Sequence, residues 1–158
     1  MTRITPAEPA RIEYLRVEDY CALKQVELKN ITPMTVLLGP NGSGKSTVFD
    51  VFAFLSECFE TGLRRAWDRR GREKELKTRG SEGPVVIAIK YKEPGYPVIT
   101  HHVAVGGRKG APVIMEEWLQ WRRGRRGKPF RFLDSKKDMD GRSAAISRTS
   151  RIPAWKFR

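Results

Sequence analysis

The sequence predicts an α/β fold in which a strand–loop–helix unit is followed by an appended antiparallel β-meander. Three observations support this fold. A glycine-rich loop over residues 39–47 directly follows an apolar run. The next residues, 48–59, are apolar at helical spacing, and four β-rich runs separated by turn residues follow Gly83.

Residues 34–38, Met-Thr-Val-Leu-Leu, form a nearly continuous apolar run, which predicts a buried parallel strand.

The loop that follows reads Gly-Pro-Asn-Gly-Ser-Gly-Lys-Ser-Thr and fits the phosphate-binding pattern GxxxxGK[ST]. Its glycines allow backbone N–H groups to curl around an anion. Lys45 would then contact the β- and γ-phosphates, and the Ser46 hydroxyl would join the coordination of Mg²⁺. A glycine-rich turn that only resembles this pattern is the alternative. The residues expected to bind the nucleotide are Gly39, Asn41, Gly42, Ser43, Gly44, Lys45, Ser46 and Thr47.

A helix is expected to start near Lys45, with the positive end of its dipole at the loop, and to end at Gly62. Apolar residues occur on almost every side of it, so we expect other elements to cover the helix all round. These residues are Val48, Phe49, Val51, Phe52, Ala53, Phe54, Leu55, Cys58 and Phe59.

The loop resembles those of ABC, SMC and RecF-like ATPases more than those of small GTPases or nucleotide kinases. Residues 12–17 and 18–28 resemble the opening hairpin of the same family, so the likeness covers residues 12–62. It identifies the chain as similar to the N-terminal P-loop NTPase lobe of a RecF/SMC-like (ABC-class) AAA family ATPase. The resemblance implies that ATP and Mg²⁺ are bound, and that an antiparallel subdomain packs against the first half of the nucleotide-binding sheet.

Two elements of a hydrolysing site are missing from the sequence. No apolar strand ends in Asp-Glu, and no Ser-Gly-Gly signature occurs. Residues 113–117 are the segment most similar to the acidic motif, but they are better interpreted as a meander strand. In the family both elements lie in the C-terminal half, so we expect hydrolysis only when a C-terminal lobe and a second protomer, in a homodimer, complete the site. Gln120 is a candidate for the family's Mg²⁺-contacting glutamine; an ordinary polar strand residue is the alternative.

Charge is segregated along the chain, whose net charge is +13. Residues 1–61 contain six basic and eight acidic residues, whereas residues 62–158 contain 25 and 10. This asymmetry indicates an anionic partner for the second part, most often nucleic acid. The basic connecting segment, residues 63–83, could contact DNA phosphates or form a solvated helix or loop anchored by Trp67.

The loop between the third and fourth meander strands is the densest positive feature. It predicts contact with a DNA backbone without base specificity, or else a solvated hairpin tip. Its candidate residues are Arg122, Arg123, Arg125, Arg126 and Lys128.

The β subdomain is expected over residues 84–134, with strands at 84–91, 98–105, 113–121 and 130–133. His101 and His102 are adjacent on a strand and point to opposite faces, which argues against a shared metal ion. Residues 1–11 are interpreted as an N-terminal extension. Residues 135–158 are interpreted as a basic tail, disordered in part, or as the start of a missing C-terminal half.

The cysteines Cys21 and Cys58 fit no metal or redox spacing, and Cys58 is expected to be a small buried side chain. No stretch is long and apolar enough to span a bilayer, so we expect a cytoplasmic protein without a membrane partner. The expected roles are DNA repair, chromosome maintenance or defence against foreign DNA. A transporter-type ABC subunit and a nucleic-acid-binding module with a non-functional loop remain as alternatives.

Overall fold

The structure is a computed structural model that describes residues 9–122, 128–137 and 143–144. Along the described chain two strands come first, the helices follow as one block, and the remaining strands come last. In order the elements are β1 (Arg11–Tyr20), β2 (Leu23–Lys29), α1 (Lys45–Thr61), α2 (Leu63–Arg69), α3 (Arg72–Leu76), β3 (Val85–Lys92), β4 (Ile99–Arg108), β5 (Ala111–Arg122), β6 (Pro129–Lys137) and β7 (Ser143–Ala144).

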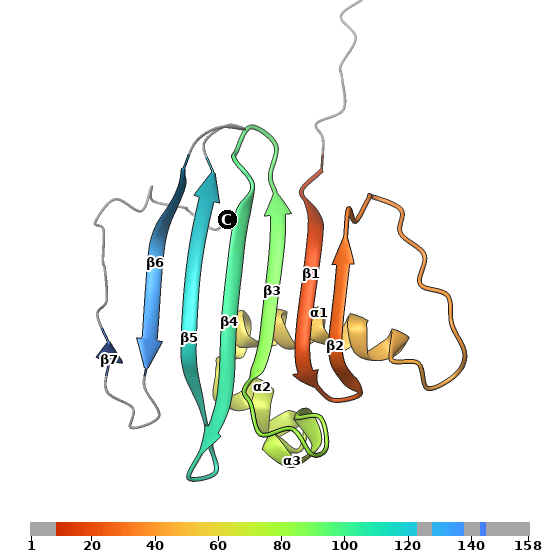
Figure 1. The fold of residues 1–158 in the computed structure, drawn as a ribbon, viewed down its shortest axis with the longest axis vertical. Helices are drawn as coiled ribbons and strands as arrows, with labels where there is room; N and C mark the ends of the chain where they lie inside the picture. The colour runs from red at the N-terminus through yellow and green to blue at the C-terminus, as the bar shows by residue number, and fades with distance from the viewer. Residues whose placement is uncertain (1–8, 123–127, 138–142, 145–158) are drawn as a thin grey trace, which may run out of the picture.

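The strands form one seven-stranded sheet in the order β2-β1-β3-β4-β5-β6-β7, and every neighbouring pair is antiparallel. The opening hairpin is confirmed: Leu15 of β1 pairs with Leu28 of β2. The meander strands are confirmed as well. The meander is joined to the opening hairpin in one sheet, because Leu15 also pairs with Ile89 of β3 (Figure 1).

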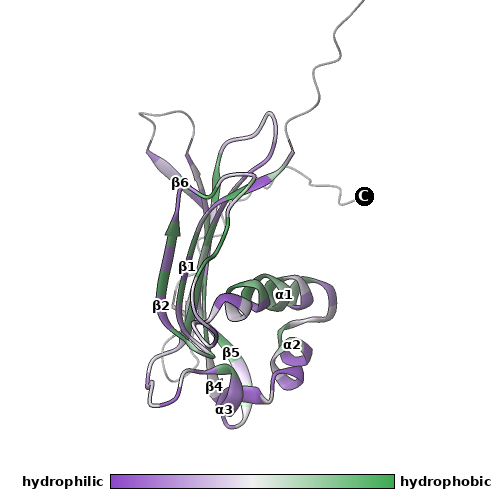
Figure 2. Ribbon diagram, turned by 90° about the vertical axis from the view of Figure 1, so that its right-hand side faces the viewer, coloured by the Kyte–Doolittle hydropathy of each residue, from purple (hydrophilic) through white to green (hydrophobic). Residues whose placement is uncertain are grey.

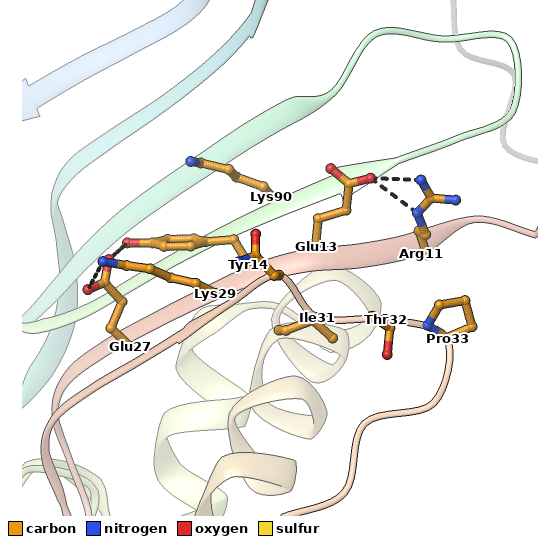
Figure 3. A pocket seen from close by; sticks show the side chains of 10 residues that line it. Arg11, Glu13, Tyr14, Glu27, Lys29, Ile31, Thr32, Pro33 and Lys90 are labelled. Atoms are coloured by element: carbon orange, nitrogen blue, oxygen red, sulfur yellow. Dashed lines mark hydrogen bonds and ion pairs between the residues drawn. The ribbon is translucent and has the colours of Figure 1, made fainter.

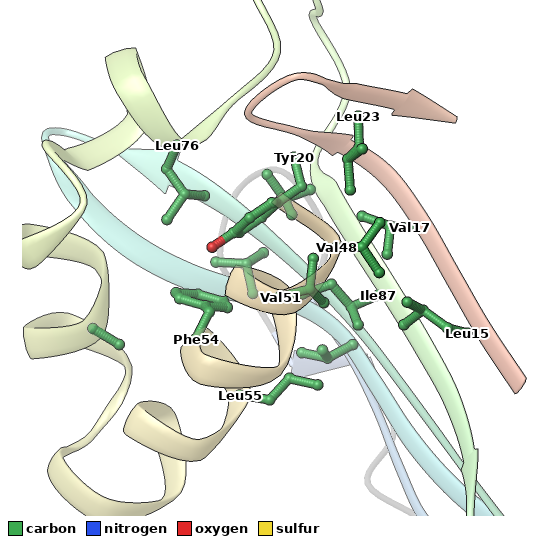
Figure 4. Close-up of a cluster of buried hydrophobic side chains, with 14 of the residues drawn as sticks. Leu15, Val17, Tyr20, Leu23, Val48, Val51, Phe54, Leu55, Leu76 and Ile87 are labelled. Carbon is green, nitrogen blue, oxygen red and sulfur yellow. The ribbon is translucent and has the colours of Figure 1, made fainter. Parts of the chain in front are cut away.

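All three helices lie on one face of this sheet, and the other face is left open by the described residues (Figure 2). Alternation along β1 points Leu15 and Val17 toward α1, where they are fully buried (Figure 4). Residues of α1 and the neighbouring strands complete this core. They include Tyr20, Val51, Phe54, Leu76 and Ile87.

The helix α1 begins at Lys45 and ends before Gly62, as predicted. The Gly62 N–H donates to the carbonyl of Cys58 at 3.2 Å, which closes the last turn. The prediction that α1 is covered all round is wrong for the described residues. One side packs on the sheet, whereas Phe49 and Phe59 are 63% and 74% exposed.

The predicted strand at residues 34–38 is also wrong. The segment is irregular, and Met34 and Leu38 are 83% and 89% exposed. A buried parallel strand needs hydrogen-bonded neighbours and cover on both faces. The described sheet offers no parallel neighbour to this segment and ends at β2, so only Leu37 packs against the core.

The basic connecting segment folds into α2 and α3, and Trp67 anchors it in the core as expected. Several of its cations are neutralised locally. Arg64 and Arg72 pair with Asp68 at 3.9 and 3.0 Å, and Arg69 pairs with Glu57 of α1. Internal ion pairs therefore neutralise part of the positive charge with which this segment was predicted to contact DNA.

Cys58 is half-buried, and this burial raises the pKa of its thiol to about 11. Cys21 is half-buried too, with its pKa raised chiefly by burial. Both thiols are therefore protonated near neutral pH, in agreement with a packing role for Cys58.

Candidate nucleotide-binding site

The glycine-rich loop leads directly into α1 and is held against the start of β2. Gly42 and Gly44 have φ angles of 80° and 86°, in the left-handed region that side chains disfavour. A Cβ at Gly44 would lie 2.7 Å from Cδ2 of Leu23. Glycine is therefore required at position 44 both for its backbone conformation and for its contact with β2.

The ammonium of Lys45 is folded back over this loop. Its Nζ donates to the carbonyl oxygens of Gly39 at 2.8 Å and Pro40 at 2.6 Å, and it lies 3.3 Å from Oγ of Ser43. Loop and lysine thus form one compact cationic unit. Phosphate oxygens are stronger acceptors than these carbonyls, so the same ammonium is placed to bind an anion at the loop.

The N-terminus of α1 points its backbone N–H groups at the same loop. No side chain caps it at Gly44, and its first turn contains no acidic residue. The positive end of the helix dipole is therefore not neutralised by the helix's own residues. Ser46 and Thr47 stand in this first turn, Ser46 exposed and Thr47 half-buried.

These donors fit a nucleotide polyphosphate with a hard divalent cation. Backbone N–H groups and Lys45 would hold the phosphates, and the Ser46 hydroxyl would supply one oxygen ligand to Mg²⁺, which takes its remaining ligands from phosphate and water. Asn41 is exposed in the same loop, beside Gly42. The described residues contain no group of three or more His, Cys, Asp or Glu side chains that could hold a metal ion.

The structure does not bring Gln120 to this site. Gln120 lies on β5, paired with Thr100 of β4 and Arg131 of β6. Through Lys90 this row continues to Tyr14, which alternates with the α1-facing Leu15 on β1. Gln120 therefore lies on the open face of the sheet, opposite α1, and the prediction that it contacts Mg²⁺ beside Ser46 gains no support.

Of the predicted nucleic-acid contacts, Arg122 and Lys128 are described, and both are exposed at the same end of the sheet. Arg123, Arg125 and Arg126 lie outside the described residues. Their part in the predicted DNA contact stays a prediction.

The two histidines lie on opposite faces, as predicted. His101 is buried on the helix side, with Nε2 3.0 Å from Oε1 of Glu117. His102 stacks on Trp118 on the open face, with ring centroids 4.9 Å apart. Both histidines thus have packing roles.

Sequence reasoning missed a polar network that fixes the position of α1. Arg70, which directly follows α2, donates to both carboxylate oxygens of Asp50, at 3.0 and 3.1 Å, and also pairs with Glu57. The Tyr20 hydroxyl donates to Asp50 at 2.5 Å from the other side. Asp50 follows Lys45 by little more than one turn, so this network stabilises the helix that carries the loop. The available signal was Asp50 itself, a carboxylate between the apolar residues Phe49 and Val51.

The loop, the uncapped helix and the folded-back lysine together define a P-loop nucleotide-binding site. A family model described as "AAA domain, putative AbiEii toxin, Type IV TA system" matches residues 34–90. The matched region contains the loop, α1 to α3 and the first part of β3. This similarity supports a P-loop ATPase of the AAA class. No solved structure matches the chain.

The match also bears on the cofactors, since domains of this class use ATP, typically with Mg²⁺. Within the part of the chain that the structure describes, no helix has the length and apolar character needed to cross a membrane.

Proposed function

We propose that this chain is the ATP-binding lobe of a RecF/SMC-like ATPase that acts on DNA. The observation that carries the proposal is the GxxxxGK[ST] loop at the uncapped N-terminus of α1, with Lys45 held over it. The matched AAA domain supports the nucleotide chemistry. Likeness in the opening hairpin, confirmed as β1 and β2, supports the narrower family.

The test is ATP binding by Lys45→Ala, measured by calorimetric titration in the presence of Mg²⁺. Removing one charge-assisted contact costs about 1.5–3 kcal/mol, or roughly a tenfold to hundredfold loss in affinity. Lys24→Ala is the matched control, because Lys24 is an exposed lysine on β2 that makes no ion pair with another described residue. Equal affinity in the wild type and the Lys45 variant would sink the proposal.

Completion of the site by a C-terminal ATPase lobe, and by a second protomer in a homodimer, is part of the proposal. The apolar segment 34–38 and the side of α1 that carries Phe49 and Phe59 support it, because their exposed apolar side chains offer a surface that another lobe could cover. The chain alone should therefore bind ATP·Mg²⁺ weakly and hydrolyse it negligibly. Robust turnover by the purified chain would show that an acidic catalytic group has been missed.

The pathway is proposed on the resemblance and on charge: DNA repair, chromosome maintenance or defence against foreign DNA, in the cytoplasm. The toxin role in the matched family's description concerns that family. Because the match is confined to residues 34–90, it supports nucleotide binding by this chain and adds no substrate.

A further inference from the structure

On the open face of the sheet, positive and negative residues are separated along the strand direction. The two rows of paired residues nearest the start of β1 contain six cations, contributed by five strands. These are Arg11, Lys29, Lys90, Lys92, Arg122 and Arg131. We call these two cross-strand rows the basic rows. The one carboxylate among them is Glu13, at the β1 bulge beside Arg11.

The next two rows on the same face have the opposite balance. By register they contain four carboxylates, Glu18, Glu27, Glu116 and Asp134, against two cations, Arg16 and Lys136. An open face that only needed solvation would mix both signs throughout. Here the sign changes halfway along the strands, which creates a directional field.

Half of the cations in the basic rows are neutralised within the sheet. Arg11 pairs with Glu13 at 3.1 Å, Lys29 with Glu27 at 3.0 Å and Arg131 with Asp134 at 3.0 Å. Lys90, Lys92 and Arg122 make no ion pair with another described residue. Their charges are therefore available to an external anion.

The surface around Lys90 is hollowed. A cavity of about 750 Å³ opens there (Figure 3). Its lining includes the ion pairs Arg11–Glu13 and Lys29–Glu27, and Lys90 is the lining cation that has no ion pair with a described residue. The Nζ of Lys90 lies 4.5 Å from the centre of the Tyr14 ring, which holds the ammonium at the wall of the hollow. An anionic group that enters this hollow meets a fixed cation.

The span of the basic rows suits a polymer better than a small ion. From β2 to β6 there are five strand spacings of about 4.8 Å, or about 24 Å. Duplex DNA carries roughly 14 phosphate charges over that length of helix axis. Separated single cations on a broad surface match such a line of phosphates.

Base stacking is disfavoured on this face. The largest aromatic ring, Trp118, already stacks on His102 of β4, and the Arg131 guanidinium carbon of β6 lies 4.7 Å from its centroid. The ring is thus engaged by both neighbouring strands. Contact with phosphates, independent of base sequence, is the interaction that this face offers.

We propose that the basic rows of the open sheet face bind the phosphate backbone of duplex DNA. The proposal rests on the DNA-linked part of the proposed function and assigns it a surface. It does not depend on ATP binding, because α1 and its loop lie on the other side of the sheet (Figure 2).

The experiment measures binding of a fluorescein-labelled 20-base-pair duplex to the full chain by anisotropy, over a range of salt concentrations. The test variant is Lys90→Gln/Lys92→Gln/Arg122→Gln. The matched control is Arg65→Gln/Lys74→Gln/Arg79→Gln, which removes the same charge from exposed residues of the connecting segment 63–83 that also make no ion pair with a described residue. Circular dichroism melting shows that both variants are folded, and titration with ATP follows the nucleotide site separately.

The face variant should bind at least about tenfold more weakly near 0.1 M salt, with a salt slope flatter by up to about 0.9 per lost phosphate contact. The control should stay within about twofold of the wild type. An unchanged slope in the face variant, an equal loss in the control, or no duplex binding by the wild type would overturn the proposal. Equally tight, equally variant-sensitive binding to phosphatidylglycerol vesicles would overturn it in favour of a lipid surface.

If DNA binding fails while Lys45→Ala still abolishes ATP binding, the surface assignment is wrong and the nucleotide site stands. If the chain does not bind ATP but the face variant binds DNA more weakly than the wild type, the nucleotide site is wrong and the surface assignment stands.

Discussion

The one-sided burial of α1 predicts very different costs for two phenylalanines on the same helix. Phe54 is 1% exposed, packs 5.7 Å from the Tyr20 ring and lies under the Arg70 guanidinium at 5.2 Å. A buried phenylalanine removes about 150–250 Å² from water, which at about 25 cal/mol/Å² corresponds to roughly 4–6 kcal/mol. Alanine retains only a small part of this area, so Phe54→Ala should lower the free energy of unfolding by about 3–5 kcal/mol.

Phe49 is the internal control, because it is 63% exposed on the same helix. Phe49→Ala should change the free energy of unfolding of the isolated chain by no more than about 0.5 kcal/mol. Urea denaturation followed by circular dichroism measures both variants. Phe54→Leu, which leaves a smaller cavity, keeps the comparison measurable if Phe54→Ala does not fold. Equal destabilisation by Phe49→Ala and Phe54→Ala would refute the one-sided packing of α1.

Two further predictions concern a loop glycine and a histidine. Gly44→Ala should lower the free energy of unfolding by roughly 1–3 kcal/mol because of its left-handed backbone, and further because the new Cβ would contact Leu23. Gly42→Ala has the same backbone penalty, but no atom lies within 4 Å of its new Cβ. Thermal melting should therefore show that Gly44→Ala is the less stable of the two variants. The pKa of His102 is lowered from 6.5, chiefly by burial and also by Arg16, His101 and Arg131, against the opposing charge of Glu116. Its contribution to stability is therefore present above pH 6.5 and lost as the pH falls through the lowered value, so His102→Gln should flatten the acid limb of a pH–stability curve; an unchanged limb would contradict this.

Local signals in the sequence predict local structure in this chain. Gly62 ends α1, and the loop glycines have the positive φ angles that a phosphate-binding loop needs. The run at 34–38 shows the limit of such signals. An apolar run predicts that a segment must be buried, but whether it forms a strand depends on neighbours that the run does not encode. Likewise, alternation in β1 and β3 predicts two strands without predicting that they pair.

The candidate sites differ in the same way. The nucleotide loop is contiguous, so its residues could be named from the sequence, and the structure adds chiefly the network around Asp50. The basic rows combine residues from five strands, and in each strand they look like the ordinary polar positions of a half-solvated sheet. Only the register shows that Lys90, Lys92 and Arg122 fall on one side of a charge boundary.

Strand β1 contributes to both proposed binding regions, because its alternate side chains face α1 and the open face of the sheet. Leu15 and Val17 pack toward α1, whereas Tyr14 and Arg16 belong to the open face. Successive side chains of a strand point to opposite faces of the sheet, so substitutions on the open face leave the packing of α1 intact. The two binding activities can therefore be removed one at a time. Any effect of ATP on DNA affinity would have to pass through displacement of the sheet strands that α1 and α2 pack against, because the helices contact the sheet on one face alone (Figure 2).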